Sequence, residues 1–155
     1  MSRYTELQQE YREHHDARNQ RAVIEPFVVA FVEEFIRYLE CPPEALKFVA
    51  KEKVTSGDPR PSITMPNEYY WALAMRLLPD INDKTFARGA WEIYLSVRKK
   101  QDSFRTKIST GGAAGTGTKS WIIAANAQAA GIHEMCEWTY ARLYEYYRDY
   151  AYFSR

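Results

Sequence analysis

The sequence lacks several features that would assign it to a large class of proteins. It has two cysteines, Cys41 and Cys136, and their spacing fits neither a zinc site nor a redox motif. No apolar run approaches the roughly 20 residues needed to cross a membrane. Residues 1–8 are polar and charged, which predicts no secretory signal. We therefore expect a cytoplasmic protein with no membrane partner, no metal and no cofactor.

Glycine is scarce and unevenly placed. Four of the seven glycines lie in residues 109–120, which hold no acidic residue and no side chain larger than threonine before Lys119. Such a segment buries too little apolar surface to offset the entropy lost on ordering. We expect one domain over residues 1–155, with a flexible loop at residues 109–120.

Aromatic residues and charge are also distributed in an informative way. The chain has 12 tyrosines, 7 phenylalanines and 4 tryptophans, and a formal net charge of +1. Residues 1–40 hold five basic and eight acidic residues, whereas residues 60–110 hold nine basic and five acidic ones. An anionic partner is therefore expected to bind the middle of the chain.

The first 51 residues carry helical signals. Residues 2–22 predict a polar amphipathic helix with Ser2 as its N-cap. Residues 27–39 carry a broad apolar stripe and predict a central helix. Pro26 either opens that helix or kinks a continuous one. Residues 43–51 predict a short helix.

The middle of the chain alternates apolar and polar residues with a period of two. This alternation covers residues 69–77, 90–98 and 104–108, and residues 60–65 are a candidate fourth strand. It predicts an antiparallel meander of three or four strands. The fold class we expect is α+β, with N-terminal helices and a long C-terminal helix flanking the sheet. The alternative is an all-α bundle, because alanine and leucine are also good helix formers.

From Trp121 onward the apolar residues recur in steps of three, four or seven, which predicts a long helix. Gly131 lies inside it and marks a bend or a tight crossing. Tyrosines continue on most sides of its end, more than one buried stripe needs. We expect this helix to form a homo-oligomer interface through the following residues: Tyr140, Tyr144, Tyr147, Tyr150, Tyr152 and Phe153.

The glycine-rich segment partly resembles a phosphate-binding loop. Gly112 and Gly117 have the right spacing, but Thr118 intrudes before Lys119 and Ser120. A strand ending near Ile108 and a helix starting near Lys119 would still leave free amides for an anion. The alternatives are a looser anion clamp and a plain connector.

The expected strands also predict a binding surface. If Trp91, Ile93, Leu95 and Val97 face the core, the residues between them form a basic and aromatic face. Bases of single-stranded nucleic acid stack on such tyrosines while cations hold the phosphates. The alternative is a solvated face, or one covered by the acidic N-terminal helix. Together with the glycine-rich segment, the predicted ligand-binding residues are Tyr70, Arg76, Tyr94, Arg98, Lys99, Lys100, Arg105, Lys107, Lys119 and Ser120.

No catalytic or metal motif accompanies these residues. His14, His15 and Asp16 are adjacent and do not share a helix face, and His133 with Glu137 predicts a helix-surface pair. We therefore expect a non-catalytic protein that binds an anionic ligand, either single-stranded nucleic acid or a nucleotide. The alternative is a homo-oligomeric structural or assembly subunit whose loop orders against a neighbouring chain.

Overall fold

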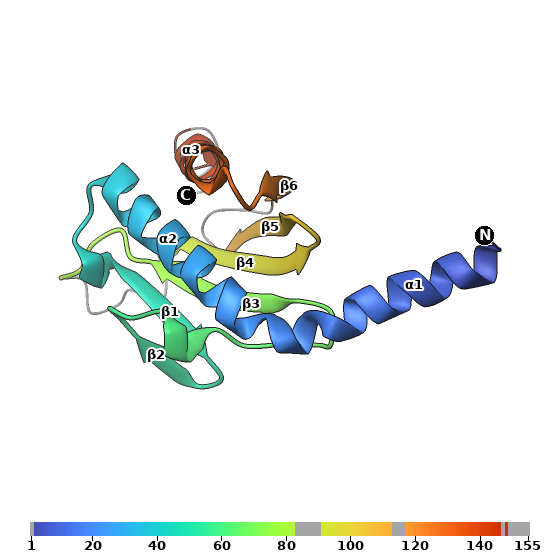
Figure 1. The fold of residues 1–155 in the computed structure, drawn as a ribbon. Helices are drawn as coiled ribbons and strands as arrows, with labels where there is room; N and C mark the ends of the chain where they lie inside the picture. The colour runs from blue at the N-terminus through green and yellow to red at the C-terminus, as the bar shows by residue number, and fades with distance from the viewer. Residues whose placement is uncertain (1, 83–90, 113–116, 147, 149–155) are drawn as a thin grey trace.

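The computed structural model describes residues 2–82, 91–112, 117–146 and 148. Six strands form one sheet, and three α-helices accompany it (Figure 1). In chain order the elements are α1 (Arg3–His15), the 3-10 helix η1 (Asp16–Gln20), α2 (Arg21–Leu39), η2 (Pro43–Ala45), β1 (Leu46–Ala50), β2 (Lys53–Thr55), η3 (Arg60–Ser62), β3 (Trp71–Leu77), β4 (Trp91–Lys100), β5 (Ser103–Gly112), β6 (Gly117–Ala124) and α3 (Gln128–Tyr146).

The sheet has the order β2-β1-β3-β4-β5-β6, and every neighbouring pair is antiparallel. This confirms the α+β class and makes the all-α alternative wrong. The expected strands correspond to β3, β4 and β5. The sheet is wider than expected because β1, β2 and β6 join it.

Three segments differ from the sequence prediction. The helix expected at residues 43–51 is the short η2 followed by β1, where Leu46 and Phe48 alternate with more exposed residues and β3 supplies the pairing. Residues 60–65 are not a strand but η3 and an isolated bridge between Thr64 and Ala72. Residues 121–124 belong to β6, so the last helix begins at Gln128. In each case pairing with another strand, or its absence, decides the structure.

Helix α2 supplies most of the helical side of the core. Its buried side chains are Ile24, Phe27, Val28, Phe31, Val32 and Phe35. Phe27 stacks on Phe104 of β5 with ring centroids 4.4 Å apart. Pro26 lies inside the helix, where the missing N–H leaves the carbonyl of Ala22 without its intrahelical partner. The helix ends at Glu40, whose backbone is left-handed at φ 53°.

Helix α3 packs on the same side of the sheet, over β5 and β6. Its buried side chains are Ile132, Met135, Cys136, Thr139 and Leu143. A Cβ on Gly131 would lie 2.7 Å from Cγ1 of Ile123 in β6. Gly131 thus marks a tight crossing of helix and strand.

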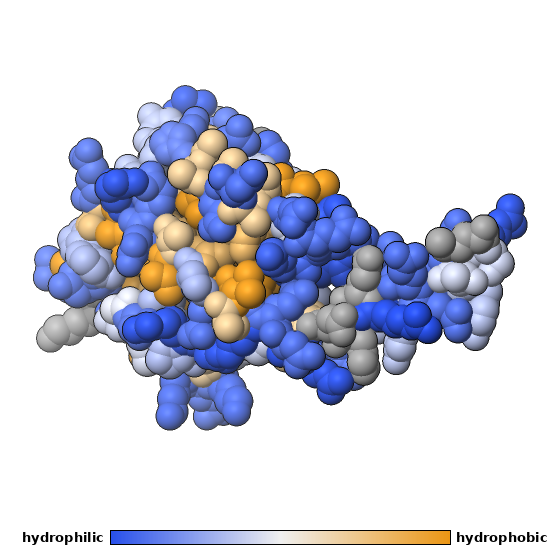
Figure 2. All heavy atoms as spheres, in the orientation of Figure 1, coloured by the Kyte–Doolittle hydropathy of each residue, from blue (hydrophilic) through white to orange (hydrophobic). Residues whose placement is uncertain are grey.

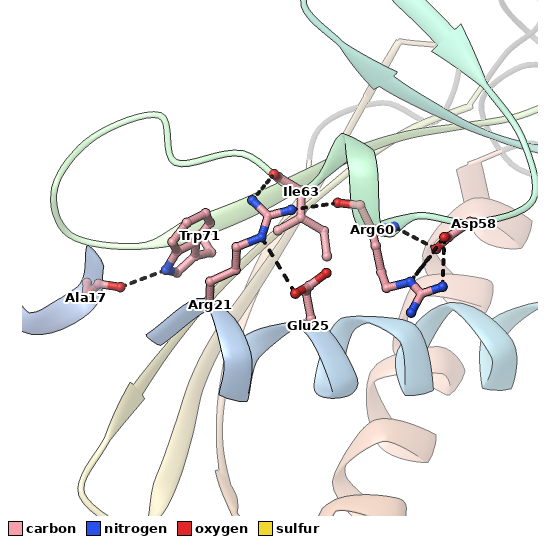
Figure 3. A network of polar contacts seen from close by, with 7 residues as sticks. All are labelled: Ala17, Arg21, Glu25, Asp58, Arg60, Ile63 and Trp71. Atoms are coloured by element: carbon pink, nitrogen blue, oxygen red, sulfur yellow. Dashed lines mark hydrogen bonds and ion pairs between the residues drawn. The ribbon is translucent and has the colours of Figure 1, made fainter. Parts of the chain in front are cut away.

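A polar network joins η1 and the start of α2 to the first residue of β3 (Figure 3). The indole Nε1 of Trp71 donates to the carbonyl of Ala17 at 2.7 Å. The guanidinium of Arg21 lies over the Trp71 ring at 5.4 Å and donates to the carbonyls of Arg60 and Ile63. The network holds Trp71, the first residue of β3, against η1 and the start of α2.

Helix α1 is set apart from this core. The Oγ of Ser2 accepts a hydrogen bond from the backbone N–H of Thr5 at 3.1 Å, which confirms the expected N-cap. The helix predicted over residues 2–22 ends at His15, and η1 turns the chain into α2. Consequently α1 extends away from the sheet as an arm (Figure 1).

Candidate functional site

The two faces of the sheet differ as the alternation predicted. In β4, Ile93, Leu95 and Val97 are fully buried and share a core with α2. The alternate positions of this strand, including Tyr94 and Arg98, point to the other side of the sheet. We call that side the outer face. The described helices lie on the opposite side of the sheet or beyond its end (Figure 1).

Strand register brings predicted residues from separate strands together on the outer face. Arg98 of β4 lies opposite Arg105 of β5. One step along, Lys107 of β5 lies opposite Ser120 of β6. With Tyr70, which precedes β3, these four residues line a depression of about 360 Å³. Cationic side chains from two strands and an aromatic ring from a third thus surround one shallow site.

A second depression, of about 310 Å³, adjoins the first along the strands. It contains Arg76 and Tyr94, the other two predicted residues on this face. Arg76 and Glu92 form a wide ion pair of 4.0 Å at its side, worth little because both groups are solvated.

The two tyrosines link the depressions. Burial raises the pKa of the Tyr94 hydroxyl, and the nearby Tyr70, which shares a hydrogen bond with it, raises that pKa further. The Tyr94 hydroxyl therefore keeps its proton to a higher pH than an ordinary tyrosine does and can donate it in the hydrogen bond with Tyr70. The hydrogen bond joins the Tyr70 ring, which lies beside Arg98, to the Tyr94 ring in the second depression.

Small residues form the floor between these side chains, and the sequence reasoning missed their role. They occupy outward positions of β3, β4 and β5 and line the two depressions. A ligand or a ring system can approach the backbone closely there. The small floor residues are Ala74, Ser96, Ser109 and Gly111. Ile122 of β6, with 66% of its surface exposed, forms an apolar edge beside them.

Three predicted residues do not join this face. Lys99 bonds through its backbone N–H and carbonyl to the side chain of Gln20, on the side of η1. Lys100 forms an ion pair of 3.1 Å with Glu10 of α1. Lys119 lies on the opposite side of β6, where its ammonium is 5.5 Å from the centre of the Trp121 ring.

The prediction that a helix starts near Lys119, directly after the glycine-rich segment, is wrong. Lys119 and Ser120 lie inside β6, and the next described helix begins only at Gln128. Gly111 and Gly112 end β5, and Gly117 begins β6. The expected loop is thus shorter than residues 109–120, and residues 113–116 lie outside the described part of the chain.

Other predicted features have more limited roles. His133 and Glu137 form the expected pair, with Nε2 and Oε1 2.9 Å apart, and Glu34 of α2 lies 3.5 Å from Nδ1. Within the described residues no group of three potential ligands is placed to hold a metal ion. The side chains of His14, His15 and Asp16 fall outside this description, as do Tyr147, Tyr150, Tyr152 and Phe153.

Comparison with known proteins does not assign this chain to a family. Comparison with protein-family models, with curated proteins and with solved structures gave no match for this chain. Among the described helices, none combines the length and apolarity that a bilayer crossing requires.

Proposed function

We propose that the protein is a non-catalytic binding protein whose outer sheet face takes an anionic ligand with aromatic rings. The ligand class is single-stranded nucleic acid or a nucleotide. The observation that carries this proposal is the position of Tyr70 beside Arg98, Arg105 and Lys107, with Tyr94 hydrogen-bonded to Tyr70 on the same face.

Each part of the face has a role in this proposal. A base stacks on the exposed side of a tyrosine ring, and nearby cations neutralise the phosphates. The small floor residues let a planar group approach the sheet without steric conflict. Sequence specificity is not expected, because stacking and charge neutralisation act on any base.

The test is the binding of a fluorescein-labelled 15-mer of deoxythymidine, followed by anisotropy across a series of salt concentrations. We expect the affinity to fall as salt rises. The logarithm of the binding constant should fall linearly with the logarithm of the salt concentration, by roughly 0.7 for each phosphate neutralised. Arg105→Glu and Lys107→Glu should weaken binding and reduce the slope. Lys119→Glu is the matched control, since it makes the same charge change on the opposite side of the same hairpin.

Absence of salt-dependent binding by the parent protein would exclude nucleic acid as the ligand. Equal losses in Lys107→Glu and Lys119→Glu would place the effect in the overall charge of the protein. The same assay with labelled nucleoside triphosphate separates a polymer ligand from a single nucleotide.

A second candidate function is that of a homo-oligomeric assembly subunit. Its supporting observation is the exposure of Tyr140 and Tyr144 on α3, at 42% and 52%, with ring centroids 5.9 Å apart. Tyr38 of α2 meets Tyr140 edge to face at 5.7 Å, which extends the aromatic surface across two helices. Light scattering that gives the same mass for the parent and Tyr144→Glu would argue against an interface at this surface.

A further inference from the structure

Helix α1 carries an apolar surface that the described part of the chain leaves exposed. The helix stands off the body as a separate projection (Figures 1 and 2). Its ion pair with the body joins the Glu10 carboxylate to Lys100. On its own, a 13-residue helix is marginally stable in water. A partner that packs along it would supply the missing stabilisation.

The exposed surface is a regular stripe. Tyr4, Leu7 and Tyr11 are spaced by three and four residues, so they share one side of the helix. Their exposed fractions are 71%, 70% and 60%. Three large apolar side chains in one line are typical of a helix that packs against another helix.

We propose that α1 pairs antiparallel with α1 of a second copy of this chain, around a two-fold axis near Leu7. In this arrangement Leu7 packs against Leu7 of the second copy. Tyr4 then packs against Tyr11 of the second copy, twice by symmetry. The contact is self-complementary and closed, so the assembly stops at a dimer.

The charges beside the stripe select the antiparallel direction. Arg3 and Glu10 are seven residues apart and therefore flank the same edge of the stripe. With a rise of about 1.5 Å per residue, Arg3 lies about 6 Å before Leu7 and Glu10 about 4.5 Å after it. Reversal of the second helix brings each Arg3 nearly level with the other copy's Glu10. In a parallel pair the same two residues would be about 10 Å apart along the axis.

The ion pair already present fits this arrangement. The ammonium of Lys100 donates to both carboxylate oxygens of Glu10, at 3.1 and 3.3 Å, and each oxygen can accept more than one hydrogen bond. A crevice of about 650 Å³ runs between α1 and the β4–β5 turn, lined by Leu7, Glu10, Lys100 and Gln101 among others. Side chains of the second helix can enter it and enlarge the contact.

Another surface of the molecule is a poorer match for the stripe. The groove between α2 and α3 has small apolar residues, Ala30, Ala129 and Ala130, on its floor. Figure 2 shows apolar side chains over α2 on this side of the molecule. Charges at its rim include Glu33, Glu34 and Arg37, and Arg37 already forms an ion pair with Glu34 within the groove. Two short helices bury less area than a standard interface, so we expect a dimer that forms at micromolar concentrations and above.

The test is a charge-swapped pair of variants studied by sedimentation velocity without nucleic acid. Arg3→Glu and Glu10→Arg each place like charges opposite one another in their own homodimers. Each should weaken self-association by about tenfold or more. Mixed one to one, they restore two opposite-charge pairs, so a heterodimer should form with an affinity close to that of the parent. Circular dichroism checks that each variant is folded.

Two further variants separate this contact from other effects. Leu7→Glu should abolish the dimer, because it places a charge at the centre of the contact. Lys100→Ala should leave the dimer in place, which shows that Glu10→Arg does not act through the lost intramolecular ion pair. A parent protein that stays monomeric at 200 µM overturns the proposal. So does a dimer insensitive to Arg3→Glu, or a mixture that forms no heterodimer. The result does not depend on the ligand of the sheet face.

Discussion

Gly131 of α3 lies so close to Ile123 of β6 that a side chain at position 131 has no room. An added Cβ would come within 2.7 Å of Cγ1 and 2.8 Å of Cγ2 of Ile123. These atoms belong to a β-branched side chain buried in the core, which cannot swing aside cheaply. This contact sets how closely the last helix approaches the edge strand.

We expect Gly131→Ala to destabilise the protein, although alanine favours helices over glycine by about 1 kcal/mol. Overpacking against Ile123 costs about 1 to 3 kcal/mol, so the net loss is about 1 kcal/mol. Urea unfolding measures it. The control is the same substitution in an Ile123→Ala background, where the clash is gone and Gly131→Ala should stabilise. An equal loss in both backgrounds would contradict the close-packing explanation.

Trp71→Phe should destabilise the protein through one lost hydrogen bond. The indole N–H donates to the carbonyl of Ala17, which is buried with its residue 1% exposed. A phenyl ring cannot donate this hydrogen bond, and the loss should cost about 1 kcal/mol in the free energy of unfolding. Arg21→Met is the comparison, because the exposed Arg21 guanidinium contributes less. If Arg21→Met lowers the free energy of unfolding more than Trp71→Phe does, the hydrogen bond from Trp71 to Ala17 is not the main stabilising contact of this network.

Cys136 should make stability fall at alkaline pH. Burial raises the pKa of its thiol from 9.0 to about 12. Between these values the unfolded chain loses the proton while the folded protein keeps it. The contribution of the thiol to the free energy of unfolding is therefore fully present below pH 9. It is lost as pH rises toward 12, by about 1.4 kcal/mol per pH unit.

Unfolding curves for the parent and Cys136→Ala, measured from pH 8 to pH 11, isolate this effect. Tyrosines and lysines also titrate in this range, so the quantity of interest is the difference between the two proteins. The parent curve should fall more steeply. Parallel curves would show that the thiol ionises equally in both states.

Tyr94→Leu should weaken binding of the single-stranded 15-mer by about 1 to 3 kcal/mol if a base stacks on this ring. Tyr94→Phe keeps the ring and removes the hydroxyl that pairs with Tyr70, so it should retain most of the affinity. Anisotropy measures both. A leucine variant that binds like the parent would leave the tyrosine without a stacking role.

The sequence predicted the parts of the sheet in which alternation is uninterrupted. Ile93, Leu95 and Val97 alternate with polar residues, and β4 places them as expected because only one side of the strand is buried. Residues 117–124 lack clear alternation, and their apolar residues also fit a helical spacing. Pairing with β5 makes them a strand, which local propensity could not reveal.

The candidate site was predictable to the same extent. Tyr94, Arg98 and Arg105 share a face because of strand parity, which is a local property. Lys119 was expected at the start of a helix, and it lies inside β6 because residues 117–124 pair with β5. The small floor residues, such as Ala74 and Ser96, carry no chemical signal in the sequence, and only their position across several strands gives them a role.

The amino-acid order alone determined which side chains of each central strand are apolar and which are cationic, since a strand alternates its side chains every two residues whatever its neighbours are. Tertiary structure decided which strands lie next to one another. It also decided that two tyrosines come together on an open face and that α1 leaves the body with its apolar stripe exposed. These outcomes depend on contacts between residues far apart in the chain, and their free energies appear only when the whole sheet and its helices assemble.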